Sequence, residues 1–312
     1  MIRVALRWSV SLGLLAALLW WLEPGRIAGE LADIQVGWLL LALLAATVPT
    51  LLSAWRWRFT AARLGLKLPW PTAVSDYYLA GFVNQVLPGG VVGDAWRAQR
   101  HAQSSGSRGK AWRAVILERA SGQVVVVLLA VLALLLHPPW RDAIAANLGP
   151  LAGSGRHGLA LSLPLLLAVV AYATRRRWQP WLAVFGRDIR CALLARHAWP
   201  FQLLSSSVIV LSYLLVFALA ARGIGLDMAV PGLMLLALPV LLAMLIPLSV
   251  AGWGFREGAA AGIWLLSGLP PEQGVAASIA YGVIVLVASS PGALVLLLRP
   301  SSRIRTQGQL DQ

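Results

Sequence analysis

Two arginines, Arg97 and Arg256, each follow a proline by nine residues and a glycine by four in otherwise apolar stretches. The two frames are Pro88-x4-Gly93-x3-Arg97 and Pro247-x4-Gly252-x3-Arg256. Proline and glycine interrupt a helix, so we expect each arginine near the start of a new helical turn, where free N–H groups and the helix dipole favour anions. The planar guanidinium also matches phosphate oxygens. The pattern predicts a phosphate clamp with one arginine from each frame. The alternatives are an arginine that reaches the membrane surface, or a salt bridge to Asp94 or Glu257.

Acidic and basic residues follow the first frame. Glu118 and Arg119 are adjacent and early in an apolar stretch, so they point to different faces of a helix. We expect Glu118 to orient Arg97 or to carry a proton, unless both neighbours reach water at the end of their segment. Asp94 is expected either to cap the helix that carries Arg97 or to contact a ligand.

Amides and glycines complete the candidate site. Asn84 and Gln85 lie in the apolar run before the first break, where they could line a polar cavity or bond to a neighbouring helix. Glu257 directly follows Arg256 and is expected to be its counter-ion or a proton carrier. The glycines of both breaks are expected to let the chain turn and approach a ligand. These glycines are Gly89, Gly90, Gly93, Gly252 and Gly254.

The composition is that of a membrane protein. The 312 residues are 59% hydrophobic and 12% charged, which is typical of a chain with several membrane spans rather than of a soluble domain. The formal net charge is +14. We expect the excess Lys and Arg to lie in cytoplasmic loops, where they contact anionic lipid headgroups. No basic segment resembles a soluble nucleic-acid-binding module, so we expect no nucleic-acid partner.

Six segments are apolar and long enough to cross a bilayer, which takes about 17–25 residues. They are residues 4–22, 36–54, 114–136, 158–174, 203–221 and 275–298. Segments 72–88 and 233–248 are also apolar, but each runs into a break. If both are re-entrant and the N-terminus is cytoplasmic, 21 of the 26 Lys and Arg face the cytoplasm and 5 face outside, as the positive-inside rule requires. If 72–98 crossed instead, the six positive charges of residues 97–119 would move outside.

We therefore expect an all-α polytopic membrane protein with about six full transmembrane helices, two re-entrant broken helices and both termini in the cytoplasm. These eight membrane segments form a single membrane domain, residues 1–312, with a first repeat of about 1–136 and a second of about 158–298. Each repeat has an odd number of full spans, which turns the second one upside down. Inverted repeats with broken helices in matching positions are typical of transporters, and the breaks indicate the binding site.

Signatures of soluble enzymes and of metal sites are missing from the sequence. The four His have no metal-ligand spacing, and there is no Gly-x-Ser-x-Gly motif or P-loop. We therefore expect no metal, cofactor or catalytic residue. A membrane-embedded lipid transferase that uses carboxylates remains an alternative.

Three stretches in this order resemble the motifs of a known family. They are LPGGVVGDAWR (87–97), ERASG (118–122) and IPLSVAGWGFREG (246–258). Together they resemble the flippase-like membrane domain family, the transmembrane region associated with lysylphosphatidylglycerol synthases, which also occurs alone. The resemblance implies an inner-membrane protein that moves a lipid between leaflets. In the fused proteins this domain is associated with flipping of aminoacylated phosphatidylglycerol. The aminoacyl-transferring soluble domain is absent from this sequence, so we do not expect synthesis of an aminoacyl lipid. The resemblance therefore does not specify which lipid is moved.

The family pattern places site residues in both frames. Carried over position by position, it falls on Pro88, Gly89, Gly90, Gly93, Asp94, Arg97, Glu118, Arg119, Pro247, Gly252, Gly254, Arg256 and Glu257.

Three functions are compatible with these observations. The first is a lipid flippase of the bacterial inner membrane that moves an anionic or phosphate-containing lipid, whether a phospholipid, aminoacyl-phosphatidylglycerol or a polyprenyl-phosphate-linked lipid. The second is a membrane-embedded polyprenyl-phosphate glycosyl- or phospho-transferase that uses the same cavity. The third is a non-catalytic partner of a separate lipid-modifying enzyme. The sequence does not indicate an oligomeric state.

Overall fold

A computed structural model describes residues 9, 13–14, 16–18, 20–22, 24–31, 34–87, 90–138, 140–142, 175–245 and 250–298. Within these ranges the regular structure is entirely helical, with twelve α-helices and one π-helical turn, so the predicted all-α class is confirmed there. The α-helices are α2 (Pro24–Glu30), α3 (Val36–Ala45), α4 (Thr47–Arg63), α5 (Trp70–Val86), α6 (Val92–Ser105), α7 (Arg108–Leu136), α10 (Arg175–Ile189), α11 (Trp199–Gly223), α12 (Val230–Ala243), α13 (Phe255–Leu266), α14 (Pro271–Ser289) and α15 (Pro291–Leu298). The π-helical turn η1 is Arg190–Leu194.

Four helical stretches in the described part of the chain are long and apolar enough to cross a membrane. They are Val36–Arg63 (α3 and α4), Arg108–Leu136 (α7), Trp199–Gly223 (α11) and Pro271–Leu298 (α14 and α15). Each contains one predicted span, so helices long and apolar enough to cross a membrane are confirmed at 36–54, 114–136, 203–221 and 275–298. The predicted span 158–174 lies outside the described residues, and 4–22 lies partly outside them.

The two predicted breaks are confirmed as interruptions between short helices. α5 ends at Val86 and α6 begins at Val92, whereas α12 ends at Ala243 and α13 begins at Phe255. At about 1.5 Å per residue, the 17 residues of α5 and the 14 of α12 extend over about 26 and 21 Å, less than a hydrocarbon core of about 30 Å. α5 packs against α6 and α12 against α13, so each element is a helical hairpin around its break.

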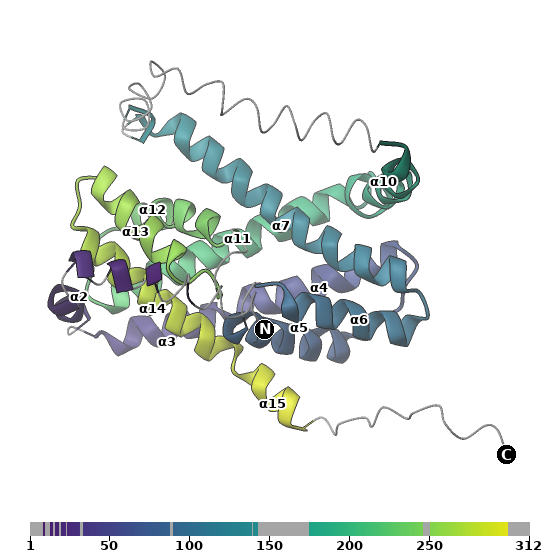
Figure 1. Ribbon diagram of the computed structural model, residues 1–312, viewed down its shortest axis with the longest axis horizontal. Helices are drawn as coiled ribbons and strands as arrows, with labels where there is room; N and C mark the ends of the chain where they lie inside the picture. The colour runs from purple at the N-terminus through teal and green to yellow at the C-terminus, as the bar shows by residue number, and fades with distance from the viewer. Residues whose placement is uncertain are drawn as a thin grey trace.

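Each half of the chain packs one of its helices against the other half. Figure 1 shows α4, α5 and α6 on one side of the molecule and α12, α13 and α14 on the other. α3 packs against α11 of the second half, whereas α15, near the end of the chain, packs against α5 of the first. Glycines permit both contacts. A Cβ at Gly223 would lie 2.2 Å from Leu39 Cδ2, and one at Gly292 would lie 2.3 Å from the Tyr78 carbonyl oxygen.

Small residues fill the helix contacts, while large apolar side chains face outward. Ala54 and Ala98 are fully buried, and such residues let helix backbones approach closely in a membrane. Leu128, Leu132 and Leu135 follow one another at helical spacing on α7 and are exposed. An apolar face of this kind suits contact with lipid.

Candidate functional site

A cavity of about 310 Å³ lies between the two halves. Side chains of α4, α5 and α7 line it from the first half and those of α11, α12 and α14 from the second. Both breaks reach it, the first through Gly90 and Val91 and the second through Ala251 and Gly252. Its volume is at the lower end of the range of about 300–1,000 Å³ for ligand sites.

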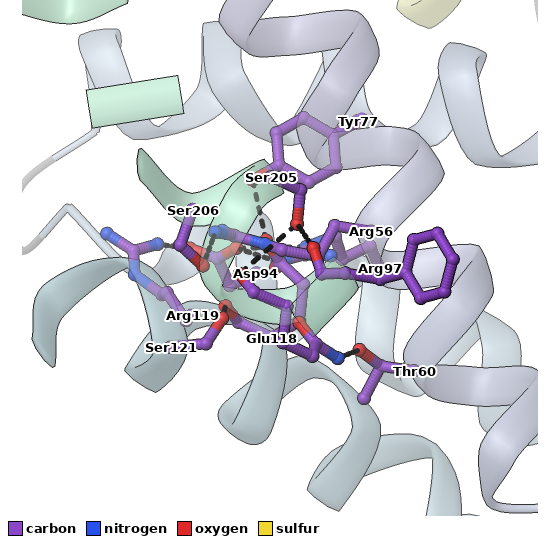
Figure 2. A network of polar contacts seen from close by, with 12 residues as sticks. Arg56, Thr60, Tyr77, Asp94, Arg97, Glu118, Arg119, Ser121, Ser205 and Ser206 are labelled. Carbon is purple, nitrogen blue, oxygen red and sulfur yellow. Dashed lines mark hydrogen bonds and ion pairs between the residues drawn. The ribbon is translucent and has the colours of Figure 1, made fainter. Parts of the chain in front are cut away.

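Glu118 of α7 is the centre of a buried polar network beside this cavity (Figure 2). Its Oε1 accepts hydrogen bonds from Nε and Nη2 of Arg56, at 3.2 and 2.7 Å, and from the Tyr77 hydroxyl at 3.4 Å. Its Oε2 accepts one from Nη2 of Arg97 at 2.7 Å. Nη1 of Arg56 donates to Ser206 Oγ at 2.8 Å. One carboxylate thus joins α4, α5 and α6 to α7, and Arg56 extends the network to α11.

Asp94, in the first turn of α6, holds three further side chains. Its Oδ1 accepts a hydrogen bond from Nε of Arg97 at 2.9 Å, and its Oδ2 accepts one from Nδ2 of Asn84 at 2.9 Å and pairs with Arg119. Asn84, on the preceding helix, also accepts the N–H of Gly93 at 2.8 Å. The expectation that Asp94 caps α6 is wrong, because the cap position is three residues earlier and the side chain of Asn84 provides the acceptor.

Arg119 is the most accessible charge of the network. Its Nη2 donates to the carbonyl oxygen of Gly90 at 3.0 Å, which ties the first break to α7. Its side chain is 38% exposed, whereas that of Asp94 is 11% exposed and those of Arg97 and Glu118 are fully buried. Arg119 also lines the cavity. Among the charged residues of the network, Arg119 therefore leaves the largest share of its side chain uncovered.

Arg97 is enclosed by aromatic rings and carboxylates. Its guanidinium carbon lies 4.7 Å from the ring centroid of Trp57 and 4.6 Å from that of Tyr77, within the range of cation–π contacts. Asp94 and Glu118 hold two of its nitrogens, while Nη1 is buried and has no hydrogen-bond partner among the described residues. Arg97 does not line the cavity.

Arg256 is enclosed in the same way in the second half. Its Nε and Nη2 donate to Oε1 of Glu257 at 2.9 and 2.7 Å, and Nε also lies 3.0 Å from Ser278 Oγ. Its guanidinium carbon lies 4.3 Å from the ring centroid of Trp253 and 5.7 Å from that of Tyr281. Nη1 is again buried, without a hydrogen-bond partner in the part of the chain that the structure describes. The two arginines differ in the source of their carboxylates: Arg256 uses the adjacent residue, whereas Arg97 uses Asp94 of its own helix together with Glu118 from the next helix.

Glycine meets two different needs at the breaks. Gly252 and Gly254 have φ angles of +85° and +89°, a region that favours glycine, and the N–H of Gly254 donates to Glu257 at 2.7 Å. Gly93 is needed for space, because a Cβ there would lie 2.1 Å from the carbonyl oxygen of Ala80 on α5. The predicted turn of the chain is confirmed for Gly252 and Gly254, whereas Gly93 lies within α6 and is needed for packing. Approach of these glycines to a ligand stays a prediction.

Some of the predicted site residues line the cavity, and the others lie in a layer behind the lining. The residues that line the cavity are Asn84, Gln85, Gly90, Glu118, Arg119 and Gly252. Those that do not are Gly93, Asp94, Arg97, Gly254, Arg256 and Glu257. Gly89 lies outside the described residues. Contact of Arg97 or Arg256 with a ligand therefore stays a prediction.

Arg56 is a charged lining residue that the sequence reasoning missed, because it counted only as a cytoplasmic charge. It is buried on α4, on a face with Ser53, Trp57 and Thr60. Positions 53, 56 and 60, like 53, 57 and 60, are separated by three or four residues, the spacing of one helix face. This spacing in the sequence could have placed Arg56 on the inward side.

Comparison with known protein families identifies the chain. The family model of the lysylphosphatidylglycerol synthase TM region matches residues 8–292. The chain belongs to this family. As a member of the lysylphosphatidylglycerol synthase TM region family it is a multi-pass membrane protein, and the resemblance drawn from the three motifs is confirmed. No curated protein gives a significant match. In the described part of the chain, no group of three or more His, Cys, Asp or Glu could hold a metal ion.

Proposed function

We propose that this protein is a lipid flippase that moves a phosphate-containing lipid between the leaflets of the bacterial inner membrane. The observation that carries the proposal is the cavity between the halves, which both breaks reach and in which two arginines, Arg56 and Arg119, accompany one glutamate, Glu118. The excess positive charge suits a phosphate group, since arginine forms strong, directional hydrogen bonds with phosphate oxygens. Family membership supports the membrane and lipid context.

The lining residues divide into charged and uncharged groups. Arg119 contacts the phosphate, because it is accessible and belongs to the lining. Arg56, which pairs with Glu118, adds a second positive charge to the lining. Asn84 and Gln85 contact the uncharged part of the headgroup.

The residues behind the lining hold the hairpins in place. Arg97 and Asp94 join α6 to α7 and to α5. Arg256 and Glu257 join α13 to α14 through Ser278. In this arrangement both breaks keep a fixed backbone geometry at the cavity while the lipid tails stay in the bilayer.

The proposed topology is an inverted repeat with both termini in the cytoplasm. The α5–α6 hairpin enters from the cytoplasm and the α12–α13 hairpin from outside, and their breaks meet at the cavity. Movement of one half against the other exposes the cavity to one leaflet at a time. A lipid with one negative charge moves outward with the membrane potential, which contributes about 2.3 kcal/mol per 100 mV.

The transferase alternative has less support from the geometry. A general base must be free to take a proton from the reacting group. Asp94, Glu118 and Glu257 are each held by at least one arginine. The chain therefore offers binding and positioning groups at this site rather than a free base.

Transport in proteoliposomes tests the proposal. Purified protein is reconstituted with fluorescent phosphatidylglycerol, and the fraction reached by an external quencher is followed with time. We expect movement with wild type, at least a tenfold slower rate with Arg119→Gln, and an unchanged rate with Arg108→Gln, an exposed arginine at the start of the same helix. Equal rates for all three proteins and for empty vesicles would overturn the proposal.

A further inference from the structure

We infer that the headgroup held in this cavity carries one net negative charge together with hydroxyl groups, and that a cationic aminoacyl headgroup is disfavoured. The inference rests on the proposed function and narrows its substrate class. Phosphatidylglycerol and a glycosyl phosphate diester of a prenol share this chemistry.

The first step concerns the carboxylates, which a cationic headgroup would need. Three acidic residues belong to the lining or to the layer behind it: Asp94, Glu118 and Glu257. Each of their six carboxylate oxygens accepts a hydrogen bond. Figure 2 shows Asp94 and Glu118. Arginines supply at least one hydrogen bond to each carboxylate. A headgroup ammonium would therefore meet carboxylates whose charge is already paired with an arginine, and it would add a further positive charge to the site.

The second step concerns the balance of charge. Arg56, Glu118 and Arg119 line the cavity, so the formal charge of the lining is one positive unit. Adding the pairs behind the lining, Arg97 with Asp94 and Arg256 with Glu257, leaves this balance unchanged. A single phosphodiester neutralises the site. Lysyl-phosphatidylglycerol, whose lysyl group carries two ammonium charges against one phosphate, would raise its charge.

The third step concerns donors that have no partner. Nη1 of Arg97 and Nη1 of Arg256 are both buried and make no hydrogen bond to a described residue. Among the described residues, the layer behind the lining therefore holds two arginine donors without a partner, whereas every carboxylate oxygen of the site already accepts a hydrogen bond. This asymmetry favours a ligand that brings acceptors.

The fourth step concerns the uncharged lining. Gln85 comes from the first hairpin and Gln123 from α7, and their side-chain amides make no hydrogen bond to another described residue. The hydroxyls of Ser53 and Tyr213 line the same space. Amides and hydroxyls both donate and accept, as the hydroxyl groups of glycerol or a sugar require. A headgroup without hydroxyls would leave these groups unsatisfied.

A comparison of transport rates for lipids of known headgroup charge tests the inference. Each preparation of phosphatidylcholine vesicles carries a trace of one labelled lipid. The lipids are phosphatidylglycerol, phosphatidylmethanol, lysyl-phosphatidylglycerol and a short-chain glycosyl phosphoprenol. Phosphatidylmethanol keeps the single negative charge but has no headgroup hydroxyl. We expect phosphatidylglycerol or the glycosyl lipid to move at least tenfold faster than the other two, and the faster of them names the source of the hydroxylated phosphate.

A charge change at one glutamine sharpens the test. Gln123→Glu adds a free carboxylate to the lining, so we expect the preference for phosphatidylglycerol over lysyl-phosphatidylglycerol to fall at least tenfold. Gln103→Glu, at an exposed position on α6, serves as the matched control and keeps the wild-type preference. Thermal unfolding of each variant shows whether it is folded, and Gln85→Glu provides a second variant with the same expectation.

The outcomes separate this inference from the proposed function. Lysyl-phosphatidylglycerol moving as fast as phosphatidylglycerol in wild type would overturn the inference and leave lipid transport standing. Equal rates for phosphatidylmethanol and phosphatidylglycerol would overturn the part that concerns hydroxyls. A preference that is unchanged in both folded glutamate variants would overturn the part that concerns charge. No movement of any lipid by folded wild type would overturn the proposed function itself.

Discussion

Oε1 of Glu118 lies 2.7 Å from Nη2 of Arg56, although the two residues are 62 positions apart in the chain and both are buried. The pair joins α7 to α4 at the wall of the cavity. The other oxygen of the same carboxylate holds Arg97 on α6. Glu118 is therefore the residue at which the first hairpin, the long helices and the cavity meet.

Removing the charge of Glu118 should destabilise the protein. In Glu118→Gln, Arg56 and Arg97 stay buried with a neutral acceptor, and we expect a loss of about 3 kcal/mol, as is usual when one partner of a buried ion pair is removed. Thermal unfolding in detergent, followed by tryptophan fluorescence, measures the effect. Asp142→Asn, with a side chain that is 73% exposed, is the control and should change little. Equal stability of the two variants would contradict the assigned role of Glu118.

Arg256 and Glu257 should behave as a coupled pair. Each single change, Arg256→Met or Glu257→Gln, leaves a buried charge without its main partner. The double variant removes both charges, so we expect it to be more stable than the sum of the single effects implies, by about 1–3 kcal/mol. A double-mutant cycle of unfolding free energies measures this coupling. Additive effects would show that the pair does not interact in the membrane protein.

Gly93 should tolerate no side chain. In Gly93→Ala the new Cβ would lie 2.1 Å from the carbonyl oxygen of Ala80, so α5 and α6 must move apart and stability should fall. Gly262→Ala is the matched control on α13, since its Cβ meets nothing within 4 Å and alanine is favoured in a helix by about 1 kcal/mol. Unfolding temperatures of the two variants should change in opposite directions. A Gly93→Ala protein as stable as wild type would contradict the close approach of α5 and α6.

Structural features that depend on residues close together in the sequence were the easiest to predict. Proline and glycine clustered before Arg97 and Arg256 predicted both breaks, because several residues of these types close together disfavour a continuous helix. Single ones, such as Pro239 and Gly122, lie within helices. Apolar runs of sufficient length predicted four spans that the structure describes. The site network was harder to predict, because Arg56 contacts residues 62 and 150 positions away. The repeated frame also suggested equivalent roles for Arg97 and Arg256, whereas their carboxylates come from different places.

The proposed topology predicts which side of the membrane the end of α6 faces. In a Cys191→Ser background, a cysteine at exposed Ser104 should react with a membrane-impermeant maleimide from the cytoplasmic side alone. The reason is that a re-entrant α5–α6 hairpin returns to the side from which it came. Labelling of intact cells from the outside would mean that α5 and α6 cross the membrane, and the inverted-repeat proposal would fail.

The most direct test of the central claim is to obstruct the cavity after the protein has folded and to measure lipid movement again. Gln123→Cys in the Cys191→Ser background places one thiol in the cavity lining. After reaction with a bulky thiosulfonate, the account predicts that phosphatidylglycerol movement falls to the rate of empty vesicles, while the same label on Ser104→Cys leaves the rate unchanged. Undiminished movement through a fully labelled Gln123→Cys protein would contradict the claim that the lipid headgroup passes through this cavity.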